Sequence, residues 1–174
     1  MRVAYGIGLV VLIGVAFGLA PPARPDQWAW ILRLLSGQWE GENPLVVAHF
    51  NVMGIWPLAM VALWRREWSR PGRLPAWPFL LGAFVLGCFA LLPYAALRRA
   101  PELGPPGVPA LVWGLLGAGF VAIAAWGLVA GDLAGWVTTA RTDGFVWPMA
   151  WDFLAFAILF GAEARGRLGV SPGV

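Results

Sequence analysis

Two side chains carry most of the chemistry in the apolar part of this chain. His49 is the only histidine, and Asp152 is the only charged residue within the long apolar segments. A histidine can move protons or ligate a metal, including the magnesium of chlorophyll. A carboxylate at bilayer depth costs about 2.5–3.5 kcal/mol on insertion scales, so it marks a candidate site for a proton or a ligand. Asn51 and Tyr94 complete the set of candidate ligand- or pigment-binding residues.

These residues must be positioned by a strongly apolar chain. Hydrophobic residues make up 60% of its 174 residues and charged residues 12%, against about 45–50% and about 25% in soluble domains. The apolar residues form segments long enough to cross a bilayer as helices, at 3–19, 44–64, 77–97, 108–130 and 145–162. We predict one all-α transmembrane domain over residues 1–174, a bundle of about five helices, in which the first helix is retained and not cleaved as a signal peptide.

A sixth, shorter helix is predicted over 26–36, where Asp26 can act as the N-cap and Gly37 as the terminator. Its apolar residues, with Trp28 and Leu32 among them, indicate either an interfacial helix at the level of the lipid headgroups or a helix packed on the bundle.

Five crossings would place the two titratable residues near opposite faces of the membrane. His49 would lie near the entry of the second helix and Asp152 near the entry of the fifth, about 15 Å apart along the normal of a hydrocarbon core of about 30 Å. This separation excludes a catalytic His–Asp pair. Tyr94 is then the expected neighbour of His49. Asp152 is expected beside the Gly54–Pro57 stretch, where proline frees a backbone carbonyl and kinks the helix.

Small residues in the fourth segment predict close helix packing. Gly127, Gly131 and Gly135 are spaced by four, and Gly114, Ala118 and Ala122 repeat the pattern on an adjacent strip. Faces of this kind let helices approach closely, within the chain or against another subunit. We favour packing within the chain.

The aromatic and basic residues fit a membrane-embedded chain. Most of the twelve tryptophans are expected at the two membrane interfaces; the alternative is a pocket for chlorophyll, a carotenoid or a quinone. All positive charge comes from arginine, without the clusters typical of nucleic-acid binding. Five crossings divide the twelve arginines six to six between the faces. The arginine-rich loop 65–76 favours the face of the amino terminus as cytoplasmic.

Three short stretches carry a resemblance to a known family. Phe50-Asn51-Val52-Met53-Gly54-Ile55-Trp56-Pro57-Leu58 is followed by Leu74-Pro75-Ala76-Trp77-Pro78-Phe79 and by Ala90-Leu91-Leu92-Pro93-Tyr94. Together they resemble a family of small multi-pass membrane proteins of cyanobacteria and chloroplasts that have no assigned activity. The resemblance covers the second and third predicted helices and implies a link to photosynthetic membranes. It supplies no functional residues.

The sequence favours a role without catalysis. It contains no metal-ligand cluster, nucleophile–base pair, phosphate loop or nucleotide fingerprint, and Cys88 is the only cysteine. We expect an accessory, assembly or scaffolding subunit of a larger complex, in contact with lipids and other membrane subunits, in a bacterial inner membrane or a photosynthetic membrane. The alternative is an enzyme or carrier for a lipid, isoprenoid or pigment that uses Asp152 with His49 or Tyr94.

Overall fold

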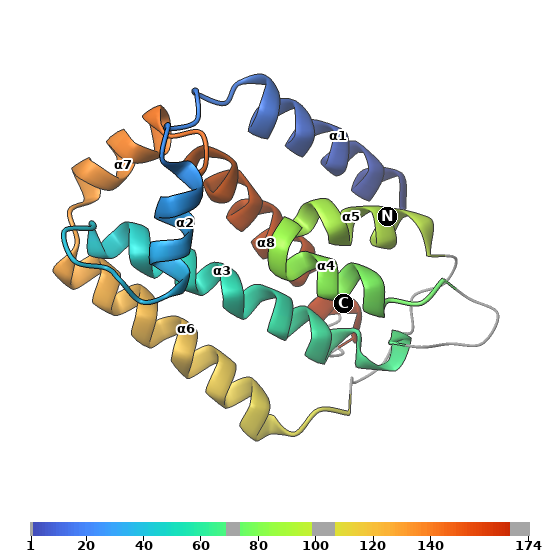
Figure 1. Ribbon diagram of the computed structural model, residues 1–174. Coiled ribbons are helices and arrows are strands. Elements are labelled where there is room, and N and C mark those ends of the chain that lie inside the picture. Colours follow the sequence, from blue (N-terminus) through green and yellow to red (C-terminus); the bar gives the residue numbers. More distant parts are fainter. Residues whose placement is uncertain (1, 69–73, 99–106, 168–174) are drawn as a thin grey trace, which may run out of the picture.

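The computed structural model describes residues 2–68, 74–98 and 107–167 and is all-helical over these ranges (Figure 1). Eight α-helices and one short 3-10 helix follow one another along the chain: α1 Arg2–Gly18, α2 Gln27–Leu35, α3 Pro44–Leu63, η1 Arg65–Glu67, α4 Trp77–Leu86, α5 Cys88–Leu97, α6 Ala110–Ala130, α7 Leu133–Thr142 and α8 Val146–Arg167. The all-α prediction is confirmed.

Three helices are long and apolar enough to cross a membrane: α3, α6 and the part of α8 over Val146–Arg165. Helix α1 is also apolar but has 17 residues, at the lower limit of about 17–25 for a crossing helix. All four helices run between the same two ends of the molecule (Figure 1). We call these the terminal end, where α1 begins and α3 and α8 end, and the α2/α7 end, where α2 and α7 lie.

The predicted continuous helix over 77–97 is wrong. The segment forms a hairpin of two ten-residue helices, α4 and α5, that both open toward the terminal end. Gly87 joins them with φ +58, a conformation that glycine adopts readily and other residues avoid. Phe79 and Tyr94 are fifteen positions apart, yet their rings lie 5.3 Å apart across the hairpin.

The hairpin changes the path of everything that follows it. A ten-residue helix is about 15 Å long, which is half of a hydrocarbon core of about 30 Å. Helix α4 therefore reaches only the middle of the bundle, and α5 returns to the end where α4 began. Helix α6 therefore starts at the terminal end, where Arg65 donates to the Gly107 carbonyl at 3.0 Å. It finishes at the α2/α7 end, where the Asn43 amide donates to the Asp132 carbonyl at 2.7 Å.

Helix α7 lies between the predicted segments 108–130 and 145–162, where no helix was predicted. Asp132 caps it by accepting hydrogen bonds from the backbone N–H groups of Ala134 and Gly135, both at 3.0 Å. Helix α2 lies where a short helix was expected, and one of its faces packs on the bundle. Trp30 and Leu34 are buried against α3, α7 and α8, while Trp28 and Leu32 are exposed on its outer side.

Two buried apolar clusters hold the bundle together. The larger joins α1, α3, α4, α5 and α8 around Met60, Leu91 and Phe156. The smaller joins α2, α3, α7 and α8 around Trp30 and Val47. Helix α6 adds no buried residue to either cluster, although its Trp113 packs against the larger one. It packs along α3, and only 6% of its apolar window is buried.

Candidate functional site

Asp152 lies on α8 at the tip of the α4–α5 hairpin. Its Oδ1 accepts a hydrogen bond from the backbone N–H of Cys88 at 2.8 Å, and the residue is only 5% exposed. The first N–H groups of a helix lack partners within the helix. Asp152 therefore supplies, from a different helix, the cap that the beginning of α5 needs.

Gly87 leaves the space that this carboxylate occupies. A Cβ atom at Gly87 would overlap the Asp152 carboxyl group. The glycine thus meets two requirements, a positive φ and close approach of a side chain. Asp152 was expected beside the Gly54–Pro57 stretch of α3, but in the structure its partner is the hairpin tip. Helix α3 itself continues through Pro57.

His49 lies on α3 toward the α2/α7 end. Its Nδ1 accepts a hydrogen bond from the indole N–H of Trp136 on α7 at 3.3 Å. The expected neighbour Tyr94 is instead bonded to Glu67 at the terminal end, with the hydroxyl 2.7 Å from Oε2. The expectation of a His49–Tyr94 pair is wrong because the fold-back at Gly87 returns Tyr94 to the end where α4 begins.

The expected separation of His49 and Asp152 along the bundle is also wrong. The His49 ring packs edge-to-face on Phe153, the residue after Asp152, with 5.4 Å between the ring centroids. His49 and Asp152 lie near the starts of α3 and α8, which both begin at the α2/α7 end. Adjacent residues of a helix point about 100° apart. Asp152 therefore faces the hairpin while Phe153 faces His49, and the two titratable groups serve different neighbours.

An apolar pocket of about 400 Å³ lies beside His49, between α3, α6, α7 and α8. Trp136 and Phe153 contribute to its lining. Because Nδ1 accepts a hydrogen bond, the proton of the neutral imidazole lies on Nε2, which then has no lone pair for a metal. Nε2 is buried without a hydrogen-bond partner among the described residues. In this geometry His49 is a hydrogen-bond acceptor through Nδ1, and neither ring nitrogen has a free lone pair for a magnesium ion.

The remaining candidates have local roles. The Asn51 amide donates to the Val47 carbonyl one turn earlier, at 2.8 Å. Gly127 and Gly131 lie against Leu45 on α3, where Cβ atoms would overlap neighbouring atoms. Gly135 lies in the first turn of α7 beside Asp132. Gly127 and Gly131 are therefore used for packing within the chain, whereas Gly135 belongs to a different helix and not to the strip.

A buried cluster of charges at the terminal end was not predicted. We call its four members the ion cluster: Glu67, Arg98, Glu163 and Arg167, each at most 6% exposed. Arg98 donates to Glu67 Oε2 at 3.1 Å and to Glu163 Oε1 at 2.5 Å, and Arg167 donates to both glutamates. Two positive and two negative charges thus neutralise one another.

Three aromatic side chains complete the ion cluster. Tyr5 on α1 donates to Glu163 at 2.6 Å, Trp64 at the end of α3 donates to Glu163 at 3.1 Å, and Tyr94 donates to Glu67. The network therefore joins the beginning of α1 to the ends of α3, α5 and α8. In the sequence the only local sign of it is the spacing of Glu163 and Arg167 by four on one helix.

Charge pairing determines the ionisation of the cluster. Burial alone would raise the pKa of Glu67, but the hydrogen bond from Arg167 and the charge of Arg98 hold that pKa below its ordinary value. Burial would lower the pKa of Arg98, yet the charges of Glu163 and Glu67 raise it. Both groups are therefore charged at neutral pH, and the cluster is a structural clamp that holds these helix ends together.

The fold and its polar groups define a class: an all-helical protein with three helices of membrane-spanning length and apolarity. Within the described residues, no group of three or more His, Cys, Asp or Glu side chains is placed to hold a metal ion. Comparison with protein-family models, with curated proteins and with solved structures finds no match to this chain.

Proposed function

We propose that the protein is an accessory or assembly subunit of a larger membrane complex and acts through contact surfaces, without catalysis. The observation that carries the proposal is the outer face of α6. Gly114, Ala118 and Ala122 are all exposed, and a Cβ atom at Gly114 would meet nothing within 4 Å. Small residues spaced by four are typical of faces that receive another helix.

The contrast between the two strips of α6 supports this interpretation. Gly127 and Gly131 bring α6 against α3, whereas the strip of Gly114, Ala118 and Ala122 has the same spacing and faces outward. The buried charges of the ion cluster are paired with one another, and Asp152 is engaged by the hairpin. The described polar groups thus serve the fold, and α6 supplies the surface for a partner helix.

The test compares proteins that co-purify with two leucine variants from the native membrane. Gly114→Leu places a bulky side chain on the proposed contact face. Gly14→Leu places the same side chain on α1 at another exposed glycine whose Cβ would also meet nothing within 4 Å. We expect the wild type and Gly14→Leu to retain the same partner subunits and Gly114→Leu to lose them. Equal retention by both variants would contradict the proposal.

The His49 pocket favours a second candidate function, a carrier of an isoprenoid, carotenoid or quinone. An apolar space of about 400 Å³ that His49 helps to line suits a hydrophobic molecule of this kind. Organic extraction of the purified protein, followed by mass spectrometry, tests this candidate. Loss of an extracted compound in His49→Phe, with the partner subunits retained, would favour the carrier.

The kind of membrane forms part of the same proposal. The resemblance carried by the Phe50–Leu58 stretch and the two shorter stretches after it favours a photosynthetic membrane, with a bacterial inner membrane as the alternative. Fractionation of the native membranes, with detection of this chain in each fraction, distinguishes the two.

A further inference from the structure

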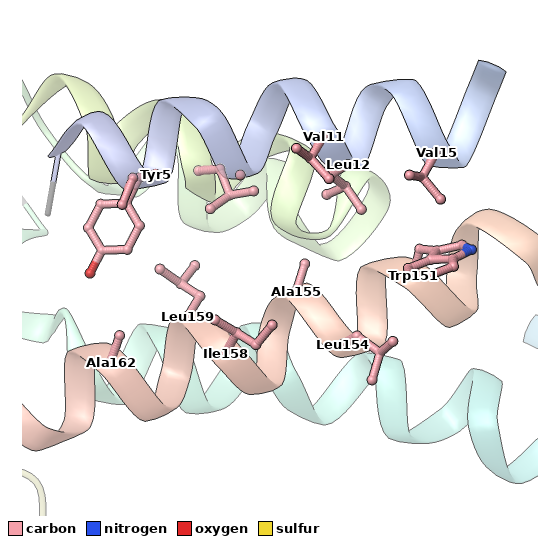
Figure 2. A pocket seen from close by; sticks show the side chains of 13 residues that line it. Tyr5, Val11, Leu12, Val15, Trp151, Leu154, Ala155, Ile158, Leu159 and Ala162 are labelled. Atoms are coloured by element: carbon pink, nitrogen blue, oxygen red, sulfur yellow. The ribbon is translucent and has the colours of Figure 1, made fainter. Parts of the chain in front are cut away.

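An apolar groove of about 440 Å³ runs along the outside of the bundle between α1 and α8 (Figure 2). One wall runs from Ala4 to Val15 on α1, and the other from Ala162 to Trp151 on α8. The buried side chains of Leu12, Leu92 and Leu159 belong to its lining. The groove is open along its length, because Val11 is 57% exposed and Ile158 is 73% exposed.

The groove has the length of one lipid chain. Each wall spans twelve residues, and the eleven steps between its ends correspond to about 16 Å at 1.5 Å per step. Half of a hydrocarbon core of about 30 Å is about 15 Å. The hollow exists because Gly8 and Ala155 lie in its lining, and a Cβ atom at Gly8 would meet nothing within 4 Å.

The two ends of the groove differ in charge. Arg2, two residues before Ala4, and Arg165, three residues after Ala162, are both exposed at the terminal end. The Arg2 guanidinium also donates to the carbonyls of Ala96 and Leu97 at the end of α5, at 3.0 and 3.2 Å. The two described acidic residues of that end, Glu67 and Glu163, are buried and paired within the ion cluster. At the opposite end, Trp147 donates to the Val15 carbonyl at 2.9 Å and packs on Trp151. One exposed arginine, Arg141 on α7, lines a neighbouring hollow with both tryptophans.

We propose that this groove binds an anionic phospholipid. One acyl chain lies between α1 and α8, and the phosphate lies at the terminal end near Arg2 and Arg165. The proposal requires that α1 and α8 are embedded in a bilayer, and it does not depend on the partner proposed for α6. An arginine at this level is worth about 1 kcal/mol of attraction to an anionic lipid surface, and the apolar groove supplies the contact area for the chain.

The first experiment fills the groove. The purified protein is reconstituted in equal amounts of phosphatidylglycerol and phosphatidylcholine, extracted gently, and examined by native mass spectrometry. We expect the wild type to retain one phosphatidylglycerol. Gly8→Leu occupies the hollow and should lose it, whereas Gly14→Leu, on the same helix but not in the lining, should retain it.

The second experiment removes the charge without filling the groove. Arg165→Gln should lower the ratio of bound phosphatidylglycerol to phosphatidylcholine about fivefold, the equivalent of about 1 kcal/mol. Arg141→Gln, an exposed arginine on α7 at the other end, should leave the ratio unchanged. Helical circular dichroism of each variant verifies that it is folded.

Two outcomes would overturn the lipid proposal. One is equal lipid retention by Gly8→Leu and the wild type. The other is loss of a co-purified protein chain, and not of a lipid, from Gly8→Leu, which would make the groove a protein contact. The function proposed through α6 fails separately, since its test is the loss of partner subunits from Gly114→Leu.

Discussion

At the residue scale, one hydrogen bond between distant parts of the chain determines the shape of the hairpin. The Asp152 carboxylate caps the Cys88 N–H, and Gly87 supplies the turn beside it. Neither residue shows this role in the sequence. A single glycine inside an apolar run is a weak signal for a break, and a lone carboxylate on α8 gives no indication of which helix it contacts.

Replacement of Asp152 by alanine should destabilise the protein by about 1–3 kcal/mol, because the buried Cys88 N–H loses its acceptor. Asp152→Asn keeps an oxygen in a similar position and should restore most of the loss. Thermal unfolding in detergent, followed by circular dichroism, measures both. Equal melting temperatures for the alanine and asparagine variants would show that the hydrogen bond does not hold the hairpin.

The ion cluster predicts a loss of stability in acid. The pKa of Glu67 lies below its ordinary value of 4.5 in the folded protein, so the unfolded chain takes up the proton first as the pH falls. The stabilisation from Glu67 is therefore complete above about pH 4.5 and decreases as the pH falls through the folded pKa. We expect the melting temperatures of the wild type and Glu67→Gln to differ at pH 7 and to converge toward pH 3.

At the element scale, the apolar pattern predicted the long helices well, but it did not predict the α4–α5 hairpin or helix α7. Helices α3, α6 and α8 lie close to the predicted segments 44–64, 108–130 and 145–162 because each is one uninterrupted apolar run. The segment 77–97 has the same composition but divides at Gly87, since its stability depends on packing against α1, α3 and α8. Helix α7 was missed because its start depends on capping by Asp132 and its apolar residues are few.

The hairpin predicts that residues before and after it lie on the same side of the membrane. Leu74 precedes α4 and Leu97 ends α5, and both are exposed. The native cysteine is first removed by Cys88→Ser. In that background, the single variants Leu74→Cys and Leu97→Cys should react with a membrane-impermeant maleimide from the same side of oriented vesicles. Leu133→Cys, exposed on α7, should react from the other side. Labelling of positions 74 and 97 from opposite sides would contradict the hairpin and support the single crossing helix predicted over 77–97.

At the scale of the whole molecule, the fold-back separates the charges. Among the described residues, six arginines lie at the terminal end (Arg2, Arg65, Arg66, Arg98, Arg165 and Arg167) with two glutamates (Glu67 and Glu163). The α2/α7 end has three arginines (Arg24, Arg33 and Arg141) and five acidic residues (Asp26, Glu40, Glu42, Asp132 and Asp143). These nine described arginines divide six to three, whereas five crossings were expected to divide all twelve evenly. The hairpin contributes to this asymmetry, because it reverses the direction of the helices after it.

This asymmetry predicts the orientation in the membrane. Arginine-rich ends remain in the cytoplasm during insertion, so we expect the terminal end to be cytoplasmic. A fluorescent protein fused to the carboxyl terminus should fluoresce, and alkaline phosphatase at the same position should be inactive. Active alkaline phosphatase there would reverse the assignment. The same carboxyl-terminal fusions in the Arg141→Gln variant serve as the control. They should give the same result, because Arg141 lies at the other end of the molecule.

The cap on the hairpin also determines an order of events during synthesis. Cys88 leaves the ribosome 64 residues before Asp152, so the α4–α5 hairpin is made before its acceptor exists. An uncapped N–H in hydrocarbon costs several kcal/mol, which disfavours early insertion of the tip. We therefore expect the hairpin to take its final depth after α8 has entered the membrane, and a chain shortened before Asp152 to keep α4 and α5 near the surface.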